Sequence, residues 1–197
     1  MTRSVYVIGG AGTGKSTFMA QLMDEFILDT RALSDIYESQ NAQGSRLVLR
    51  GHDCISKDVQ RGVYLGCLRD QFPGTDGLDR ASSKAATEWL RGAELSGFII
   101  AEGATLTTTP FLLALDDRTD LLLVHLWAEP FVRELRYQER GSNQDASWIL
   151  NSITRAANMA KKFENRQAQL LTVDSADPAA WSLALAACLT HLEGTDQ

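Results

Sequence analysis

Residues 9–17 read GGAGTGKST, and the first eight letters match the pattern G-x-x-x-x-G-K-[ST] at every fixed position. Glycines in such a loop let the backbone wrap closely and direct its N–H groups at phosphate oxygens, while the following helix presents its positive N-terminal end to the same anion. Lys15 is expected to reach the β- and γ-phosphates, and the Ser16 hydroxyl to bind Mg²⁺. The sequence therefore predicts a site for a purine nucleoside triphosphate with Mg²⁺, expected to be ATP, formed by Gly9, Gly10, Ala11, Gly12, Thr13, Gly14, Lys15, Ser16 and Thr17.

Outward from this loop, apolar runs alternate with helical patterns along the chain. Strands are expected at 4–8, 63–68, 97–101, 121–127 and 169–173, with a further candidate at 46–50. Helices are expected at 15 to about 28, 78–95, 130–140 and 146–165, and two more begin at Pro110 and Pro178. Because strands that alternate with helices form parallel sheets covered on both faces, we expect an α/β P-loop NTPase fold with about five parallel strands. We expect one domain over residues 1–197, with a helical lid at about 130–165.

The composition is typical of a globular protein and excludes several functional classes of protein. Hydrophobic residues make up 44% and charged residues 22%, and the formal charge of −6 excludes a uniformly basic nucleic-acid-binding surface. Three widely spaced cysteines without a CxxC pair argue against a zinc site or a disulfide framework. No apolar stretch reaches the roughly 18 residues that a membrane-spanning helix needs. We therefore expect a cytoplasmic protein without a membrane partner.

The residues beyond the loop favour a kinase over a GTPase or a motor ATPase. The apolar strand 97–101 is followed by Glu102-Gly103, where GTPases and ATPases usually carry an aspartate, and the chain has no Asn-Lys-x-Asp stretch that would read guanine. A kinase needs an acceptor pocket, a carboxylate near the attacking hydroxyl and arginines that neutralise the transferring phosphoryl group. A nucleotide-dependent switch protein with negligible phosphoryl transfer stays open as a different class.

Suitable arginines occur on the predicted helix 130–140. Arg133, Arg136 and Arg140 are spaced i, i+3 and i+7, so they share one helix face. A polar break follows, and Arg155 lies on the next predicted helix. We interpret the two helices as a lid, in which Arg140 is catalytic while Arg136 and Arg155 contact the substrate. The alternative interpretation is a solvated basic helix face.

Two carboxylates compete for the role of general base. Asp76 lies in a loop rich in Pro and Gly, and we assign it to the acceptor hydroxyl; alternatively it caps the helix that follows. Glu102 lies where Mg²⁺ is expected, and we assign it to magnesium or to acceptor contacts. Asp53 is a third candidate for the base. The predicted catalytic set is Lys15, Asp76, Arg140 and Glu102, and the predicted magnesium ligands are Ser16 and Glu102.

The order of these segments resembles a family of bacteriophage P-loop kinases, some of which phosphorylate 5-hydroxymethyluracil within DNA while others are described as thymidylate or nucleoside kinases. The resembling segments are 9–17, 65–66, Arg69, 72–76, 89–90, 101–103, 136–142 and Trp148. The resemblance implies a kinase fold with a helical insertion, a phage origin, and hence the host cytoplasm as location. It also supports Asp76 as the acceptor-side carboxylate. The predicted acceptor contacts come from Arg69, Thr75, Asp76, Glu102, Arg136 and Arg155, although the lid helix carries only Arg155 where the family has an arginine-lysine pair. The chain departs from the family in carrying Ala104, rather than a basic residue, after Glu102-Gly103.

These observations predict an ATP- and Mg²⁺-dependent phosphotransferase that moves the γ-phosphate to a hydroxyl of a nucleoside or nucleotide, or of 5-hydroxymethyluracil in DNA. A nucleoside monophosphate kinase that acts on free nucleotides is the alternative. A DNA acceptor requires a basic groove for the backbone. The candidates for that groove are Arg133, Arg136, Arg140, Arg155, Lys161 and Lys162. The sequence leaves open the acceptor, the preference for ATP or GTP, and the oligomeric state.

Overall fold

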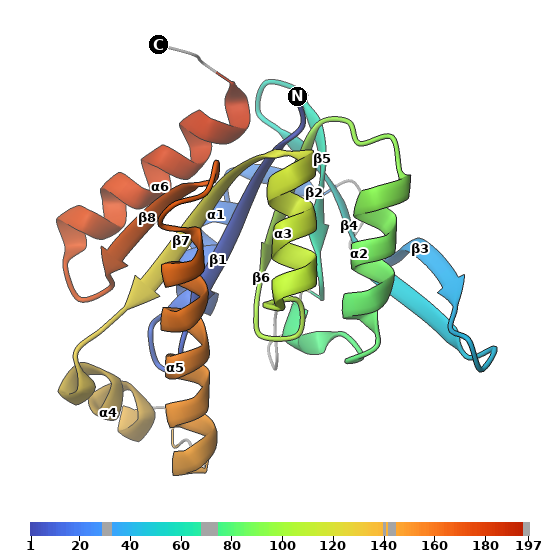
Figure 1. Ribbon diagram of the computed structural model, residues 1–197. Helices are drawn as coiled ribbons and strands as arrows, with labels where there is room; N and C mark the ends of the chain where they lie inside the picture. Colours follow the sequence, from blue (N-terminus) through green and yellow to red (C-terminus); the bar gives the residue numbers. More distant parts are fainter. Residues whose placement is uncertain (29–32, 68–74, 140, 142–144, 195–197) are drawn as a thin grey trace.

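The computed structural model describes residues 1–28, 33–67, 75–139, 141 and 145–194, and the strands among them form one sheet (Figure 1). Five parallel strands lie in the order β5-β6-β1-β7-β8. Their bounds are β1 (Arg3–Gly9), β5 (Arg61–Leu65), β6 (Phe98–Glu102), β7 (Asp120–Trp127) and β8 (Gln169–Asp174). All five coincide, within a few residues, with the apolar runs that predict them. The prediction of an α/β fold around a parallel sheet is confirmed.

Three antiparallel strands extend the sheet beyond β5. Strand β4 (Arg46–Ser56) pairs with β5 on one side, and on the other with β2 (Phe26–Leu28) and β3 (Ser34–Gln40). The sequence pattern indicates a strand only for the first residues of β4. The hairpin of β3 and β4 is stabilised at its surface by ion pairs from Arg46 and Arg50 to Asp35.

The helix that follows the glycine-rich loop is shorter than expected. Helix α1 (Lys15–Met23) ends before Phe26, so the prediction of a helix to about residue 28 is wrong. Phe26 fits the helical spacing of apolar residues, but its ring packs against Phe98 of β6 with centroids 5.2 Å apart. The backbone of residues 26–28 then pairs with β4 instead of continuing the helix. Packing against a distant strand overrides the local pattern here.

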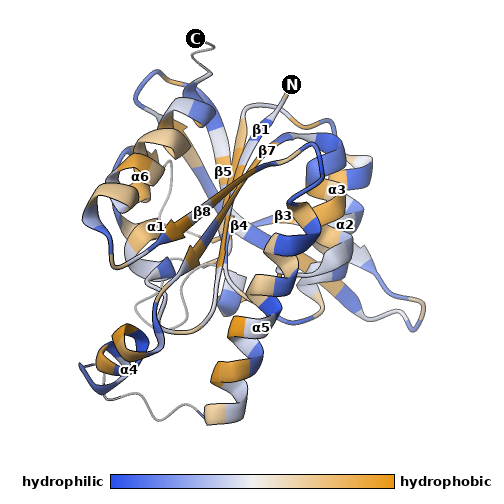
Figure 2. Ribbon diagram, turned by 60° about the vertical axis from the view of Figure 1, so that its left-hand side comes forward, coloured by the Kyte–Doolittle hydropathy of each residue, from blue (hydrophilic) through white to orange (hydrophobic). Residues whose placement is uncertain are grey.

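Helices cover both faces of the sheet. Helices α1 and α6 (Pro178–Glu193) lie on one face, and α2 (Ser82–Gly92), α3 (Thr109–Arg118) and α5 (Ala146–Phe163) lie on the other (Figures 1 and 2). The central strand β1 is apolar on both faces, because alternate residues pack into the two cores that the helices close. Within the described residues, no helix combines the length and apolarity needed to cross a membrane.

The carboxyl ends of the parallel strands share one edge of the sheet. Beyond this edge project α4 (Pro130–Glu139) and the N-terminal half of α5 (Figure 2). Helix α4 has no buried residue, whereas α5 buries Ala156, Met159, Ala160 and Phe163, all in its C-terminal half. Because ligands of open α/β sheets bind outside the carboxyl ends of the strands, this edge is where a functional site is expected.

Candidate active site

The glycine-rich loop connects the end of β1 to the start of α1. Gly12 (φ 74°) and Gly14 (φ 86°) are in the left-handed region, which glycine adopts without strain. Gly14 is the N-cap of α1 and has no side chain to occupy the amides of the first helical turn. The Thr13 hydroxyl is buried and donates to the Gly10 carbonyl oxygen at 2.8 Å, closing the loop on itself. The amides at this helix N-terminus are therefore available to an anion.

Helix α4 is bonded to the carbonyl side of the loop. The Arg136 guanidinium donates to the Gly12 carbonyl at 3.0 Å, and to the hydroxyl and carbonyl oxygens of Ser175 at 2.8 and 2.9 Å. The Tyr137 hydroxyl donates to the Ala11 carbonyl at 2.7 Å. The structure thus places Arg136, expected to contact the substrate, behind the loop and in contact with protein oxygens. Arg136 therefore links the loop, α4 and the turn after β8.

Helix α5 contacts the opposite side of the loop. The Ala11 amide donates to the Ser152 hydroxyl at 2.9 Å, and that hydroxyl donates to the Ile149 carbonyl at 2.7 Å. Gly10 lies so close to Ile153 that a Cβ at position 10 would come within 2.5 Å of its Cγ1 atom. The Ser152 hydroxyl therefore accepts a hydrogen bond from one loop amide, as a phosphate oxygen would.

Glu102 is the buried carboxylate of the site. It ends β6 beside Val7 of β1, its side chain is 1% exposed, and its Oε1 atom has no hydrogen-bond partner among the described residues. Burial raises the pKa of Glu102 to about 7, the charge of Asp76 adds to this rise, and the positive charge of Lys15 opposes it. An unsatisfied buried carboxylate needs a proton or a cation, so Glu102 is suited to bind one.

The residues present fit a magnesium ion that is bound together with a nucleotide. Mg²⁺ prefers oxygen ligands and is commonly held by one or two carboxylates plus substrate phosphates. Glu102 supplies a carboxylate with a free oxygen, and Ser16 supplies an exposed hydroxyl in the first turn of α1. The described residues contain no group of three or more His, Cys, Asp or Glu side chains that could hold a metal ion.

Asp76 is held by the end of β6. It lies in the short 3₁₀-helix η1 (Thr75–Gly77), and its Oδ1 atom accepts a hydrogen bond from the Ala104 amide. The alternative that Asp76 caps the next helix is wrong, because α2 begins at Ser82. Gly103 (φ 111°) makes this contact possible, since a Cβ there would lie 2.9 Å from Asp76 Oδ1.

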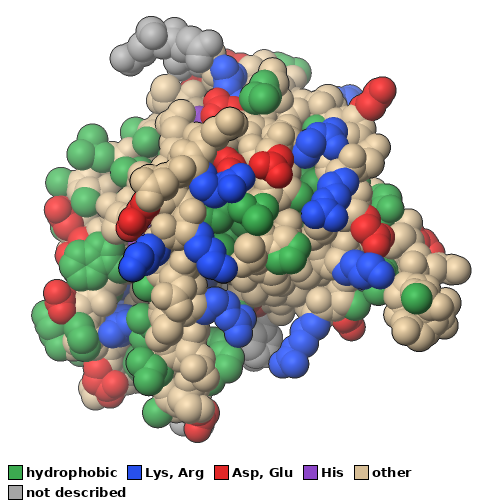
Figure 3. Space-filling model, in the orientation of Figure 1, with side chains coloured by type: hydrophobic (Ala, Val, Ile, Leu, Met, Phe, Trp, Pro, Cys, Tyr) green, Lys and Arg blue, Asp and Glu red, His purple; other side chains and the backbone are tan. Residues whose placement is uncertain are grey.

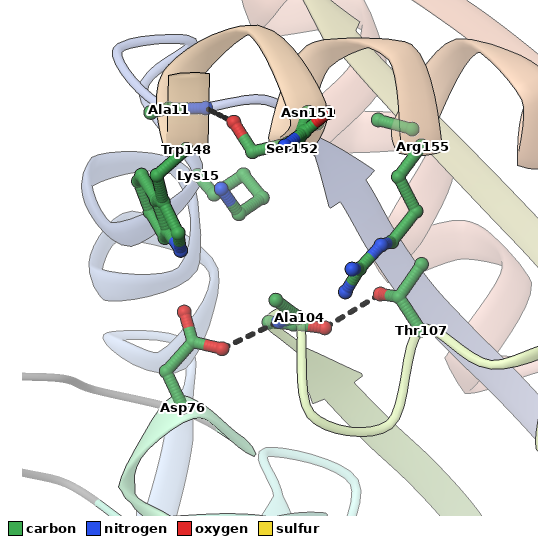
Figure 4. A pocket seen from close by; sticks show the side chains of 12 residues that line it. Ala11, Lys15, Asp76, Ala104, Thr107, Trp148, Asn151, Ser152 and Arg155 are labelled. Carbon is green, nitrogen blue, oxygen red and sulfur yellow. Dashed lines mark hydrogen bonds between the residues drawn. The ribbon is translucent and has the colours of Figure 1, made fainter. Parts of the chain in front are cut away.

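A pocket brings several of these groups together (Figure 4). Lys15 enters it from the loop, with its Nζ atom 3.3 Å from the Gly10 carbonyl, and Asp76 enters from the opposite wall. The side chain of Arg155 projects into it from α5 (Figure 4). The complete lining is Gly9, Ala11, Lys15, Asp76, Gly103, Ala104, Thr107, Trp148, Asn151, Ser152, Arg155 and Ala156. A cation, a carboxylate and the phosphate loop thus share one cavity.

Other predicted site residues lie elsewhere. Thr75 is fully buried and accepts from the Leu106 amide at 3.4 Å, so it supports η1 rather than lining the pocket. Asp53 lies on β4, in a different pocket near Arg61. Arg69 and Arg140 lie outside the described residues. Lys162, a candidate for a DNA groove, donates to the Thr109 hydroxyl at 2.8 Å.

Sequence reasoning missed three residues of the site. Ser152 and Asn151 belong to a helical pattern in which polar residues usually face solvent, and no motif distinguishes them. Tyr137 adjoins Arg136 on α4, but its contact with the Ala11 carbonyl depends on how the helix docks. Trp148, Ser152 and Arg155 are spaced i, i+4 and i+7, so helical spacing places them on one face and is a signal that could have grouped them.

A glycine-rich loop at a helix N-terminus, a buried carboxylate at the end of the adjacent strand and a pocket with a second carboxylate form the arrangement expected of a P-loop kinase. The sequence matches the family described as P-loop Nucleotide Kinase3 over residues 1–190, and the chain belongs to that family. None of the curated proteins compared is a significant sequence match.

Two solved structures are similar to this chain. An unliganded sugar kinase from Janibacter sp. is 16% identical with a TM-score of 0.51, and the alignment covers 99% of this chain and 96% of that chain. A shikimate kinase from Acinetobacter baumannii, solved with shikimate, is 13% identical with a TM-score of 0.45, covering 100% and 97%. At these identities the first structure shows the fold alone.

Proposed function

We propose that this kinase transfers the γ-phosphate of Mg²⁺-bound ATP to a hydroxyl of a nucleoside or nucleotide, or of 5-hydroxymethyluracil in DNA. One observation carries the proposal: Asp76 and Lys15 line the same pocket, next to the N-terminus of α1. The acceptor hydroxyl then lies between a group that takes its proton and a group that stabilises the phosphate it attacks.

In the proposed reaction, the acceptor oxygen attacks the γ-phosphorus, the bond from that phosphorus to the β–γ bridging oxygen breaks, and ADP leaves. The proton of the hydroxyl passes to the Asp76 carboxylate. Lys15 and the amides of the loop stabilise the charge on the β- and γ-phosphates. Glu102 is the proposed protein ligand for Mg²⁺, which neutralises phosphate charge when it is bound.

The remaining choice is between a free nucleotide and DNA. Figure 3 shows Lys and Arg side chains distributed along α5 and across towards α2, with Asp and Glu among them. Such a mixed surface can contact the phosphate backbone of DNA, but only weakly. The resemblance to phage kinases also favours a modified base in DNA. Arg155, a cation inside the pocket, favours an acceptor that carries a phosphate, and so keeps a nucleoside monophosphate kinase as the second candidate.

Transfer of labelled γ-phosphate from ATP with Mg²⁺ tests the proposal directly. Three acceptors are compared: single nucleosides, nucleoside monophosphates, and DNA that contains 5-hydroxymethyluracil. The label is expected in at least one of them and absent with Lys15→Ala. Label in DNA identifies a base-modifying kinase, label on a monophosphate group identifies a nucleoside monophosphate kinase, and label in none overturns the proposal.

A further inference from the structure

One face of α5 forms a wall of the pocket. Trp148, Asn151, Ser152 and Arg155 are spaced i, i+3, i+4 and i+7, so they lie on one side of the helix, and all four line the cavity. Figure 4 shows Trp148 above Asp76 at one end of the cavity, and Arg155 reaching towards Thr107 at the other. The wall therefore presents an aromatic ring, an amide and a guanidinium in that order.

Trp148 is not part of the core. Its side chain is 48% exposed, although tryptophan is usually well buried, and the buried residues of α5 begin only at Ala156. Among the described residues no aromatic ring stacks on it. A flat, exposed indole in a pocket is suited to stack on a planar ring, as aromatic side chains do with nucleobases.

Asn151 and Arg155, the two polar side chains of the wall besides Ser152, have no partner among the described residues. Within the described part of the chain, neither the Asn151 amide nor the Arg155 guanidinium makes a side-chain hydrogen bond or an ion pair. An amide offers one acceptor and two donors, which matches the edge of a nucleobase, and a guanidinium matches a phosphate. Trp148 and Arg155 are two helical turns apart, roughly 10 Å, which is the length scale of one nucleotide from base to phosphate.

We infer that this wall binds the acceptor as a nucleotide whose base stacks on Trp148 and whose phosphate pairs with Arg155, so that the hydroxyl that receives the phosphoryl group is carried by the base. The order of the groups supports this orientation, because Trp148 lies at the Asp76 end of the cavity and Arg155 at the far end. Asn151 bonds the edge of the base. The inference rests on the proposed function but specifies which part of the acceptor reacts.

A polyol acceptor is the main competing occupant. A sugar ring can also lie against an indole face, but it offers the Asn151 amide and the Arg155 guanidinium no planar edge and no anion. Two acceptors that differ in one atom separate the possibilities: 5-hydroxymethyl-2′-deoxyuridine 5′-monophosphate and thymidine 5′-monophosphate. They share the base ring, the sugar hydroxyl and the phosphate, and only the first has a hydroxyl on the base.

Binding is measured first, without ATP, by isothermal titration of 5-hydroxymethyl-2′-deoxyuridine 5′-monophosphate. Trp148→Leu is expected to raise the Kd roughly tenfold to a hundredfold, the scale for loss of one base–aromatic stack. Trp148→Phe, which keeps a ring, is expected to restore most of the affinity. Leu150→Ala is the matched control, because Leu150 is 64% exposed on the same helix and does not line the pocket. An unchanged Kd in Trp148→Leu, or equal affinity for deoxyribose 5-phosphate, overturns the inference.

Transfer is measured second, with both monophosphates. Phosphorylation of the hydroxymethyl compound at its base hydroxyl, with thymidine 5′-monophosphate unreactive at its sugar hydroxyl, supports the orientation. Equal labelling of both monophosphates at the sugar hydroxyl overturns the orientation. Phosphorylation of shikimate or of a hexose that falls to the same extent in Trp148→Leu also overturns it. If binding requires Trp148 but no phosphoryl group is transferred, the inference about the binding wall stands and the proposed function is rejected. The two failures are therefore distinguishable.

Discussion

Two side chains of α4 donate hydrogen bonds to carbonyl oxygens of the phosphate loop, whereas a single hydroxyl of α5 accepts one from a loop amide. The carbonyl side is bonded further through Arg136 to the turn after β8. The amide side faces the pocket, where Ser152 holds a position that a phosphate oxygen can take. The difference indicates that the carbonyl side supports the loop, while the amide side faces the pocket in which the proposed function places the substrates.

Among the variants that test this comparison, the largest effect is expected on the pocket side, from Asp76→Asn. The asparagine carbonyl can still accept from the Ala104 amide, so the fold should persist, but the side chain can no longer take a proton. Turnover should fall roughly a hundredfold or more, the scale of general-base catalysis, with ATP affinity little changed. Asp79→Asn is the control, because Asp79 also accepts from a backbone amide, that of Ala81, yet does not line the pocket. Equal activity losses in the two variants would contradict the role as base.

The buried carboxylate beneath the loop predicts a pH effect on stability. The pKa of Glu102 is about 7 in the folded protein against an ordinary 4.5, so the native state binds this proton more tightly. The stabilisation is complete below about pH 4.5 and is lost as the pH rises to about 7, on the order of 3 kcal/mol in total. Urea unfolding of the nucleotide- and magnesium-free protein from pH 4.5 to 8 should show this loss. Glu102→Gln should abolish it, and an identical slope in the variant would refute the assignment.

On the carbonyl side, Arg136→Ala should act through stability. It removes three hydrogen bonds from a charged donor, so the thermal midpoint should fall by about 5 °C. ATP should bind roughly tenfold less tightly, because the loop loses its link to α4 and Ser175. Arg133→Ala is the control on the same helix, since Arg133 makes no hydrogen bond or ion pair to the described residues. A slower reaction with an unchanged midpoint would instead support the direct substrate contact expected from sequence.

The smallest effect is expected from Ser152→Ala. Its hydroxyl competes with the nucleotide for the Ala11 amide, so its removal should tighten ATP binding about two- to fivefold, the worth of one neutral hydrogen bond. Isothermal titration with Mg²⁺ and a non-hydrolysable ATP analogue provides the measurement. Weaker binding would show that the hydroxyl supports the nucleotide-bound loop rather than competing with it.

Local patterns predicted the parts of this protein that local chemistry determines. The five parallel strands follow from continuous apolar runs, and the phosphate loop follows from glycines and a lysine at fixed spacing. The same reasoning extended α1 through Phe26, because nothing near that residue reveals its contact with Phe98. Spacing also shows which side chains share a helix face but not what that face meets, so the bonds of Arg136 to Gly12 and Ser175 were not expected.

The residues of the candidate site also fall into two groups, those that local patterns predict and those that depend on contacts between distant segments. Lys15, Asp76 and Arg155 were all proposed from sequence and lie in one pocket. Ser152 was not proposed, because its role arises only when α5 docks onto the end of β1, more than a hundred residues earlier in the chain. A contact between segments this distant has no counterpart in the pattern of either segment.

The division of α5 into a buried half and a projecting half bears on how acceptor specificity can change. The C-terminal half anchors the helix in the core, whereas residues 146–155 contribute no buried side chain to it. Substitutions at exposed positions away from caps and buried contacts usually alter stability by no more than about 0.5 kcal/mol. Substitutions at Trp148, Asn151 or Arg155 should therefore cost little folding stability. If the proposed acceptor wall is right, this short segment is where variants can acquire new acceptors while the phosphate loop stays the same.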